Sequence, residues 1–171
     1  MRTVVLSLLT LLLSYPCLAD QVIEHGGHKI VSFDLPQLEY RATKTGKTTR
    51  TYFSNPVGNG NLKLTVTTKG WLSEEEAIKR YEDDKKRKRA NPETRLHDSK
   101  EIPGAMKTLF YSMSSPYRGK VIVVYTKDFR CELLITGTND AEDQINPTYE
   151  QLAESLKVIP RTKIGDLKIG D

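Results

Sequence analysis

The chain has 171 residues, and its 26 Lys and Arg against 22 Asp and Glu give a formal net charge of +4. So small a surplus excludes a polycation built to neutralise nucleic-acid phosphate. With two cysteines the chain cannot form the dense disulfide framework of many small secreted proteins, so core packing must stabilise its fold.

The first nineteen residues have the pattern of a secretory signal peptide. Arg2 supplies a positive charge, an almost uninterrupted aliphatic run follows from Val4 to Leu13, and Cys17 and Ala19 place small side chains where signal peptidase recognises them. The run is shorter than the roughly 20 apolar residues that cross a bilayer. We therefore expect cleavage near Ala19 and a secreted or periplasmic protein with no transmembrane segment in its mature chain.

Residues 20–171, which remain after cleavage, fit a single domain. Residues 20–27, with Gly26-Gly27 as a hinge, are expected to form a flexible leader, and residues 28–159 the folded domain. Residues 160–171, which contain Lys-Ile-Gly-Asp twice, are expected to be a disordered tail. Cys131 is then the only cysteine, so no intramolecular disulfide is expected. The short leader and the missing disulfide favour a bacterial periplasm.

Four segments are predicted between the leader and the first helix. His28 to Leu35 predicts a strand, and the polar stretch from Tyr40 to Lys47 a loop or a weak edge strand. Arg50 to Phe53 predicts a short strand that Asn55-Pro56 closes. Apolar and polar side chains alternate from Asn61 to Thr68, as expected of a half-buried strand.

The first helix is predicted over residues 73–89. Ser73 is the expected N-cap, and Glu76 three residues later completes a capping box. The acidic first turn suits the helix dipole. Pro92 follows the expected end of the helix.

The second half of the chain returns to strands and ends in a helix. The predicted strands are a polar edge candidate at residues 94–101 and three longer runs at 105–113, 120–125 and 129–136. The runs Val121 to Tyr125 and Leu133 to Ile135 are continuously apolar, which is typical of strands covered on both faces. Asn146 and Pro147 predict the N-cap and first turn of the second helix.

These elements predict an α+β fold. We expect an α/β/α sandwich in which one mostly antiparallel sheet of about six to seven strands is covered by helices on both faces.

The order of these elements resembles the PsbP-like superfamily. The resemblance spans about residues 28–159, and it is carried by the Ser73 helix and by four further features: the first strand ending at Pro36, the strand with Leu62, Leu64 and Val66, the stretch Ile102-Pro103-Gly104-Ala105, and the closing helix with Glu154-Ser155-Leu156. That group includes the extrinsic photosystem II subunit, a Ran-binding import factor and exported bacterial proteins of unassigned role. The resemblance implies the sandwich fold and a non-enzymatic role, and it transfers no site residue.

The basic run from Lys85 to Arg89 resembles a nucleic-acid or nuclear-targeting motif when it is read alone. On a helix, however, acidic residues one turn earlier offset most of it. The expected pairs are Glu75–Lys79, Glu76–Arg80, Glu82–Lys86, Asp83–Arg87 and Asp84–Lys88. The run is therefore interpreted as a solvated helix face, with Lys85 and Lys88 extending over the sheet. Contact with an acidic partner or an anionic membrane surface is the lesser alternative, and nucleic acid is not expected as a partner.

No group of residues predicts catalysis or metal binding. Cys131 shares a predicted strand face with apolar residues and is interpreted as a small core side chain. His25 and His28, with Glu24 and Asp34 nearby, lack the spacing of a structural zinc site. The carboxylates at 74–76 and 82–84 are interpreted as ordinary helix surface, without the separated environments of an acid–base pair. We expect no enzymatic activity, no cofactor and no metal.

Trp71, Tyr117 and Arg118 are the predicted partner-binding residues. Tyr, Trp and Arg dominate binding hot spots, and loops on a rigid sheet carry function. The sequence predicts an exported, non-catalytic accessory or interaction protein whose loops bind another exported or envelope protein. The alternative is a periplasmic carrier of a small molecule or metal that uses a pocket at one end of the sheet.

Overall fold

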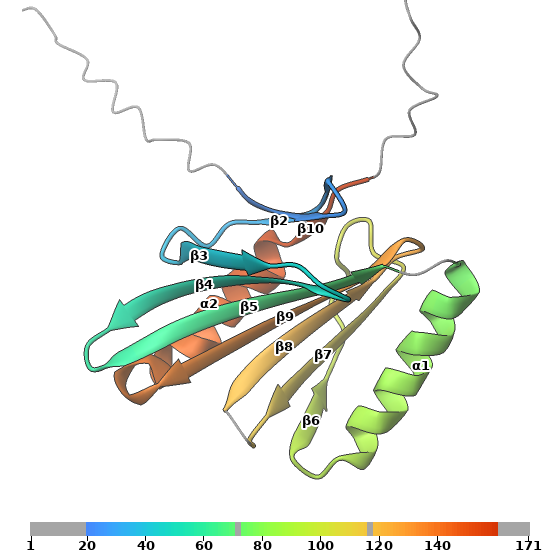
Figure 1. Ribbon diagram of the computed structural model, residues 1–171. Helices are drawn as coiled ribbons and strands as arrows, with labels where there is room; N and C mark the ends of the chain where they lie inside the picture. The colour runs from blue at the N-terminus through green and yellow to red at the C-terminus, as the bar shows by residue number, and fades with distance from the viewer. Residues whose placement is uncertain (1–19, 71–72, 116–117, 161–171) are drawn as a thin grey trace, which may run out of the picture.

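The computed structural model describes residues 20–70, 73–115 and 118–160 (Figure 1). The predicted signal peptide and all but Pro160 of the predicted tail lie outside these ranges.

A small sheet begins the described chain. It contains three antiparallel strands in the order β1 (Gln21–His25), β2 (His28–Phe33) and β10 (Lys157–Val158). The segment expected to be a flexible leader thus contains β1, which pairs with β2. Gly26 and Gly27 form the two-residue turn between them, with φ of 59° and 77°. Two positive φ values suit a tight hairpin turn, so the glycines are turn residues and not a hinge.

The main sheet is antiparallel and has seven strands in the order β3-β4-β5-β9-β8-β7-β6. Its strands are β3 (Glu39–Lys44), β4 (Thr49–Val57), β5 (Gly60–Gly70), β6 (Thr94–His97), β7 (Lys107–Met113), β8 (Gly119–Tyr125) and β9 (Phe129–Thr138). β4 continues past Asn55-Pro56, the expected end of that strand. Pro56 is opposite Asn61 of β5, but the pairing with β3 ends at Glu39 and Ser54, so on that side no strand needs the missing N–H of Pro56.

Helix α1 (Glu74–Ala90) begins as predicted, because the Ser73 hydroxyl accepts a hydrogen bond from the Glu76 backbone N–H at 3.2 Å. Helix α2 (Ile145–Ser155) begins slightly earlier than expected. A 3-10 turn, η1 (Asn139–Gln144), precedes it, so Asn146 and Pro147 lie in its first turn and Asn146 is not the N-cap. No sequence pattern predicted this turn.

Two apolar clusters lie on opposite sides of the main sheet. The larger one fills the space between the sheet, the small sheet and α2, and includes Phe33, Leu64, Leu133 and Leu152. The smaller one lies under α1, where Tyr81 packs against side chains of β7 and β8. Figure 1 shows α2 behind the main sheet and α1 beside β6 and β7.

The prediction of one sheet covered by helices on both faces is wrong. The described chain is mostly β, with two antiparallel sheets and only two α-helices. One side of the main sheet is covered by α2 together with the small sheet, and α1 packs mainly on β6, β7 and β8. The side chains from Val121 to Tyr125 of β8 are all buried, as predicted. On β9, buried and partly exposed side chains alternate, and Leu134 is partly exposed. The outer side of β3, β4 and β5 is therefore open.

Candidate functional site

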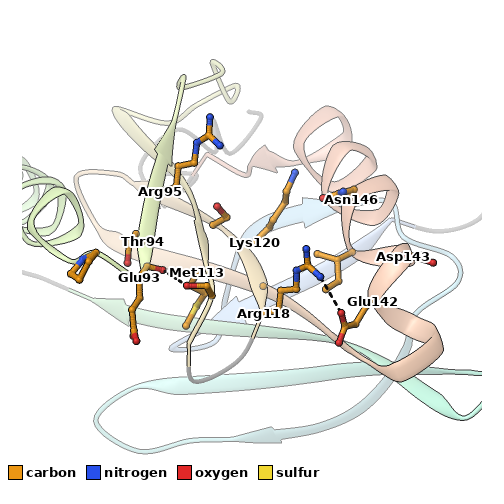
Figure 2. A pocket seen from close by; sticks show the side chains of 14 residues that line it. Glu93, Thr94, Arg95, Met113, Arg118, Lys120, Glu142, Asp143 and Asn146 are labelled. Atoms are coloured by element: carbon orange, nitrogen blue, oxygen red, sulfur yellow. Dashed lines mark hydrogen bonds and ion pairs between the residues drawn. The ribbon is translucent and has the colours of Figure 1, made fainter.

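A cleft of about 410 Å³ lies between the start of α2 and strands β6, β7 and β8. Figure 2 shows the side chains that line it. Arg95 comes from β6, Lys120 from β8, and Arg118 from the residue before β8. Glu142 lies on η1, which the β9–η1–α2 connection brings to the same cleft. Residues far apart in the sequence thus meet here, and we refer to the site as the β8–α2 cleft.

The charges in the β8–α2 cleft are partly separated by sign. Figure 2 shows Arg95 and Lys120 extending to one side of the cleft, and Glu93 and Glu142 to the other. Arg118 forms an ion pair with Glu142 at 3.2 Å, but its side chain is 76% exposed, so the pair contributes little to stability. Lys120 lies over the ring of Tyr149 at 4.6 Å from the centroid, which orients its ammonium group.

A histidine and a serine lie beside these cations. His97 Nε2 and Ser112 Oγ are 3.1 Å apart across β6 and β7. Partial burial lowers the pKa of His97 below its ordinary value, and the positive charges of Lys120 and Arg95 lower it further, against the opposing charges of Asp98 and Glu150. These effects favour the neutral form of the imidazole.

The arrangement does not amount to a catalytic dyad. A serine nucleophile needs a base that a third group orients, together with donors for the developing oxyanion. Over residues 20–70, 73–115 and 118–160, no carboxylate hydrogen-bonds to His97. The pair lies on an exposed sheet surface, so the geometry supports recognition of a polar partner better than acyl transfer.

We expect the NMR titration midpoint of His97 to lie below that of a histidine in an unstructured peptide. Lys120→Gln removes one of the positive charges that disfavour the imidazolium, so this substitution should raise the midpoint. Lys127→Gln, an exposed change outside the cleft, serves as the control and should leave the midpoint unchanged. Equal midpoints in the wild type and the Lys120 variant would show that Lys120 does not act on His97.

Of the three predicted partner-binding residues, the structure places one. Arg118 lines the β8–α2 cleft, whereas Trp71 and Tyr117 lie outside the described residues. Arg95 and Lys120 were missed because each lies on a strand that reads as ordinary sheet. The polar composition of residues 94–101 was the one signal that could have pointed to Arg95.

The structure places Cys131 in the core and His25 beside the main sheet. Cys131 is a buried core side chain as predicted, and burial raises the pKa of its thiol. His25 contacts Thr68, with Nδ1 at 3.0 Å from Oγ1. In the part of the chain that the structure describes, no group of three or more His, Cys, Asp or Glu side chains is arranged to hold a metal ion.

The interpretation of residues 82–84 as solvated helix surface is wrong for Asp84. This side chain is 2% exposed and accepts hydrogen bonds from Tyr125 Oη at 2.8 Å and from Arg130 Nε at 3.1 Å. Arg87 also donates to it, at 2.7 Å, so the pairing of Asp83 with Arg87 expected from the sequence is replaced. The expected position over the sheet is confirmed for Lys88, whose ammonium group lies over Tyr111 of β7. The ammonium group of Lys85 lies instead over Tyr81 of α1 itself.

The fold and the cleft together define a small, β-rich protein with a charged surface cleft. No family model, curated protein or solved structure matches the chain. The resemblance to the PsbP-like superfamily therefore stays a prediction. Within the described residues no helix is long and apolar enough to cross a membrane.

Proposed function

We propose that the protein is an exported, non-catalytic binding protein that holds part of another exported or envelope protein in the β8–α2 cleft. The observation that carries this proposal is the partial separation of charge in the cleft. Arg95 and Lys120 lie on one side, and Glu93 and the Arg118–Glu142 pair lie on the other. Complementary charges on a partner would fix its orientation and exclude wrong partners. The rigid strands β7 and β8 support the site, so little ordering is needed on binding.

A photo-crosslinking side chain at Ser114, on the exposed rim of the cleft, tests this proposal. In the organism that makes the protein, we expect one discrete adduct whose partner mass spectrometry identifies. The reversal Arg95→Glu with Arg118→Glu should abolish that adduct. The same photo-crosslinker at exposed Thr45, which lies between β3 and β4 at the edge of the main sheet opposite β6, is the control. An adduct that survives the reversal, or equal adducts from both positions, would contradict the proposal.

A second cavity supports the carrier alternative. It has a volume of about 380 Å³ and lies between β2, β10 and the β8–β9 turn, where Ile30, Phe129 and Val158 give it an apolar lining. A volume of this order fits a small ligand. A metabolite or metal present at about 100 times its dissociation constant would add about 2.7 kcal/mol to the free energy of unfolding. A thermal-shift screen that finds such a ligand would favour the carrier, and a screen without one would favour the interaction protein.

A further inference from the structure

The uncovered side of the main sheet forms a continuous surface. Cross-strand pairing shows which side chains share it, because directly opposed residues point to the same face. On β5, Lys63, Thr65 and Thr67 are opposite Ser54, Tyr52 and Arg50 of β4. Thr65 is also opposite Leu134 of β9, which packs against the apolar cluster under α1. These side chains of β4 and β5 therefore lie on the same side of the main sheet as α1. We call this surface, formed by β3, β4, β5 and β9, the open face.

The open face is strongly basic. The cations that these four strands place on it are Arg41, Lys44, Arg50, Lys63, Lys69 and Arg130, and the acids are Glu39 and Glu132. Arg130 is bonded to Glu132 and to the buried Asp84 of α1, so the exposed charges are five cations against Glu39, a surplus of four. Strand alternation, and not a basic run in the sequence, concentrates this charge.

The two acids of the open face are already paired. Glu39 forms an ion pair with Arg41 at 3.0 Å, and Glu132 accepts a hydrogen bond from Arg130. By contrast, Arg50, Lys63 and Lys69 are exposed and form no ion pair among the residues that the structure describes. These three side chains can therefore form ion pairs with an anionic partner.

Helix α1 forms a wall along this surface. Arg80 and Arg87 both reach Asp84, which bonds to Arg130 of β9, so the two arginines lie on the side of α1 that faces the open face. Glu76 and Asp83 lie on the same turns of the helix and reduce the positive charge there. A helix with its side chains is about 10–12 Å thick, so the strands are recessed behind it by a distance comparable to the Debye length of about 8 Å. A flat bilayer resting on α1 would feel little of the charge on the strands.

The side chains of the open face favour an acidic polypeptide over a nucleic acid as the bound anion. Its one aromatic ring, Tyr52, is half-buried and has Lys44 Nζ 5.9 Å from its centroid, so it offers no free platform on which bases could stack. The neighbouring arginines already bind carboxylates, as Arg41 does with Glu39. The half-buried hydroxyls of Thr65 and Thr67 lie between the cations and can hydrogen-bond to a polypeptide. These features favour carboxylates on an extended chain.

We propose that the open face binds an extended acidic segment of a protein partner, whose Asp and Glu side chains pair with Arg50, Lys63 and Lys69. This surface is separate from the β8–α2 cleft and does not depend on it. The contact is electrostatic and largely exposed, so its affinity decreases as salt increases.

The test measures binding of fluorescein-labelled deca-glutamate to the protein by fluorescence anisotropy. The variant Arg50→Gln, Lys63→Gln, Lys69→Gln removes three charges from the open face. The matched control Lys29→Gln, Lys100→Gln, Lys157→Gln removes the same number of charges from exposed positions on the side of the small sheet and α2. We expect the open-face variant to bind at least about tenfold more weakly and the control to stay within about twofold of the wild type. All three open-face side chains point to solvent, and Lys63→Gln alone is the fallback if the triple variant does not fold.

Two results would overturn the proposal. The first is an absence of deca-glutamate binding at about 50 mM salt, or an equal loss in both triple variants, which would indicate only a response to net charge. The second is tighter binding of a single-stranded oligonucleotide, or of phosphatidylglycerol vesicles, that the open-face variant abolishes. This second result would leave a basic docking surface in place but assign it to a different class of partner.

Discussion

Replacing Asp84 by alanine is expected to lower the free energy of unfolding by about 3–5 kcal/mol. Asp84 is 2% exposed and joins α1 to β8 through Tyr125 and to β9 through Arg130. Its removal leaves the Arg130 guanidinium, only 14% exposed, with Glu132 as its remaining carboxylate partner, and it removes the carboxylate that accepts from the buried Tyr125 hydroxyl. A buried charge that loses one of its partners costs more than an exposed ion pair contributes.

Urea unfolding monitored by circular dichroism measures this effect. Asp83→Ala, which removes the preceding carboxylate from an exposed position of the same helix, is the matched control and should change stability by less than about 1 kcal/mol. Asp84→Asn should also destabilise, because it keeps the shape of the side chain and removes the charge. If Asp84→Ala is as stable as Asp83→Ala, α1 is held by its apolar contacts alone.

Leu133→Ala is expected to cost about 2–5 kcal/mol, and Leu134→Ala clearly less. The two leucines are neighbours on β9, but their side chains point to opposite faces of the main sheet. Leu133 is fully buried in the larger apolar cluster, where its truncation leaves a cavity. Leu134 is partly exposed at the margin of the smaller cluster, so water can occupy the space that its truncation opens.

The pair is its own control, because both substitutions remove the same atoms from the same strand. Chemical denaturation of the two variants gives the comparison directly. Equal losses of stability would mean that both faces of β9 are covered in solution, as the sequence had suggested, and that the open face does not exist. The measurement therefore also tests the surface on which the acidic-partner proposal depends.

Much of the local structure could be predicted because its causes lie within a few residues. The cap at Ser73 depends on Glu76 in the same turn, and the strand around Leu64 follows from simple alternation. The β1–β2 hairpin was missed although its signal was also local. Gly26-Gly27 serves equally well as a hinge or as a tight turn, and only the pairing with β2 distinguishes the two.

The site residues were harder to predict because their neighbours are distant in the sequence. Arg118 was predicted from residue type and loop position, but Glu142, its ion-pair partner, lies on a 3-10 turn that had no sequence signal. Arg95 and Lys120 lie on different strands, and the order of the strands in the sheet decides that they border one cleft.

The Ser73 cap, the alternation of β5 and the burial of Cys131 were set by the sequence alone, since side chains within one turn or one strand determine them. The tertiary structure decided the partner of Asp84, the side of the sheet that α1 leaves uncovered and the charge gathered there. The reason is that a side chain such as Lys63 or Asp84 has the same local chemistry whether it is exposed or buried. Whether it is exposed or buried depends on the strand or helix that packs against it, and that element is distant in the sequence.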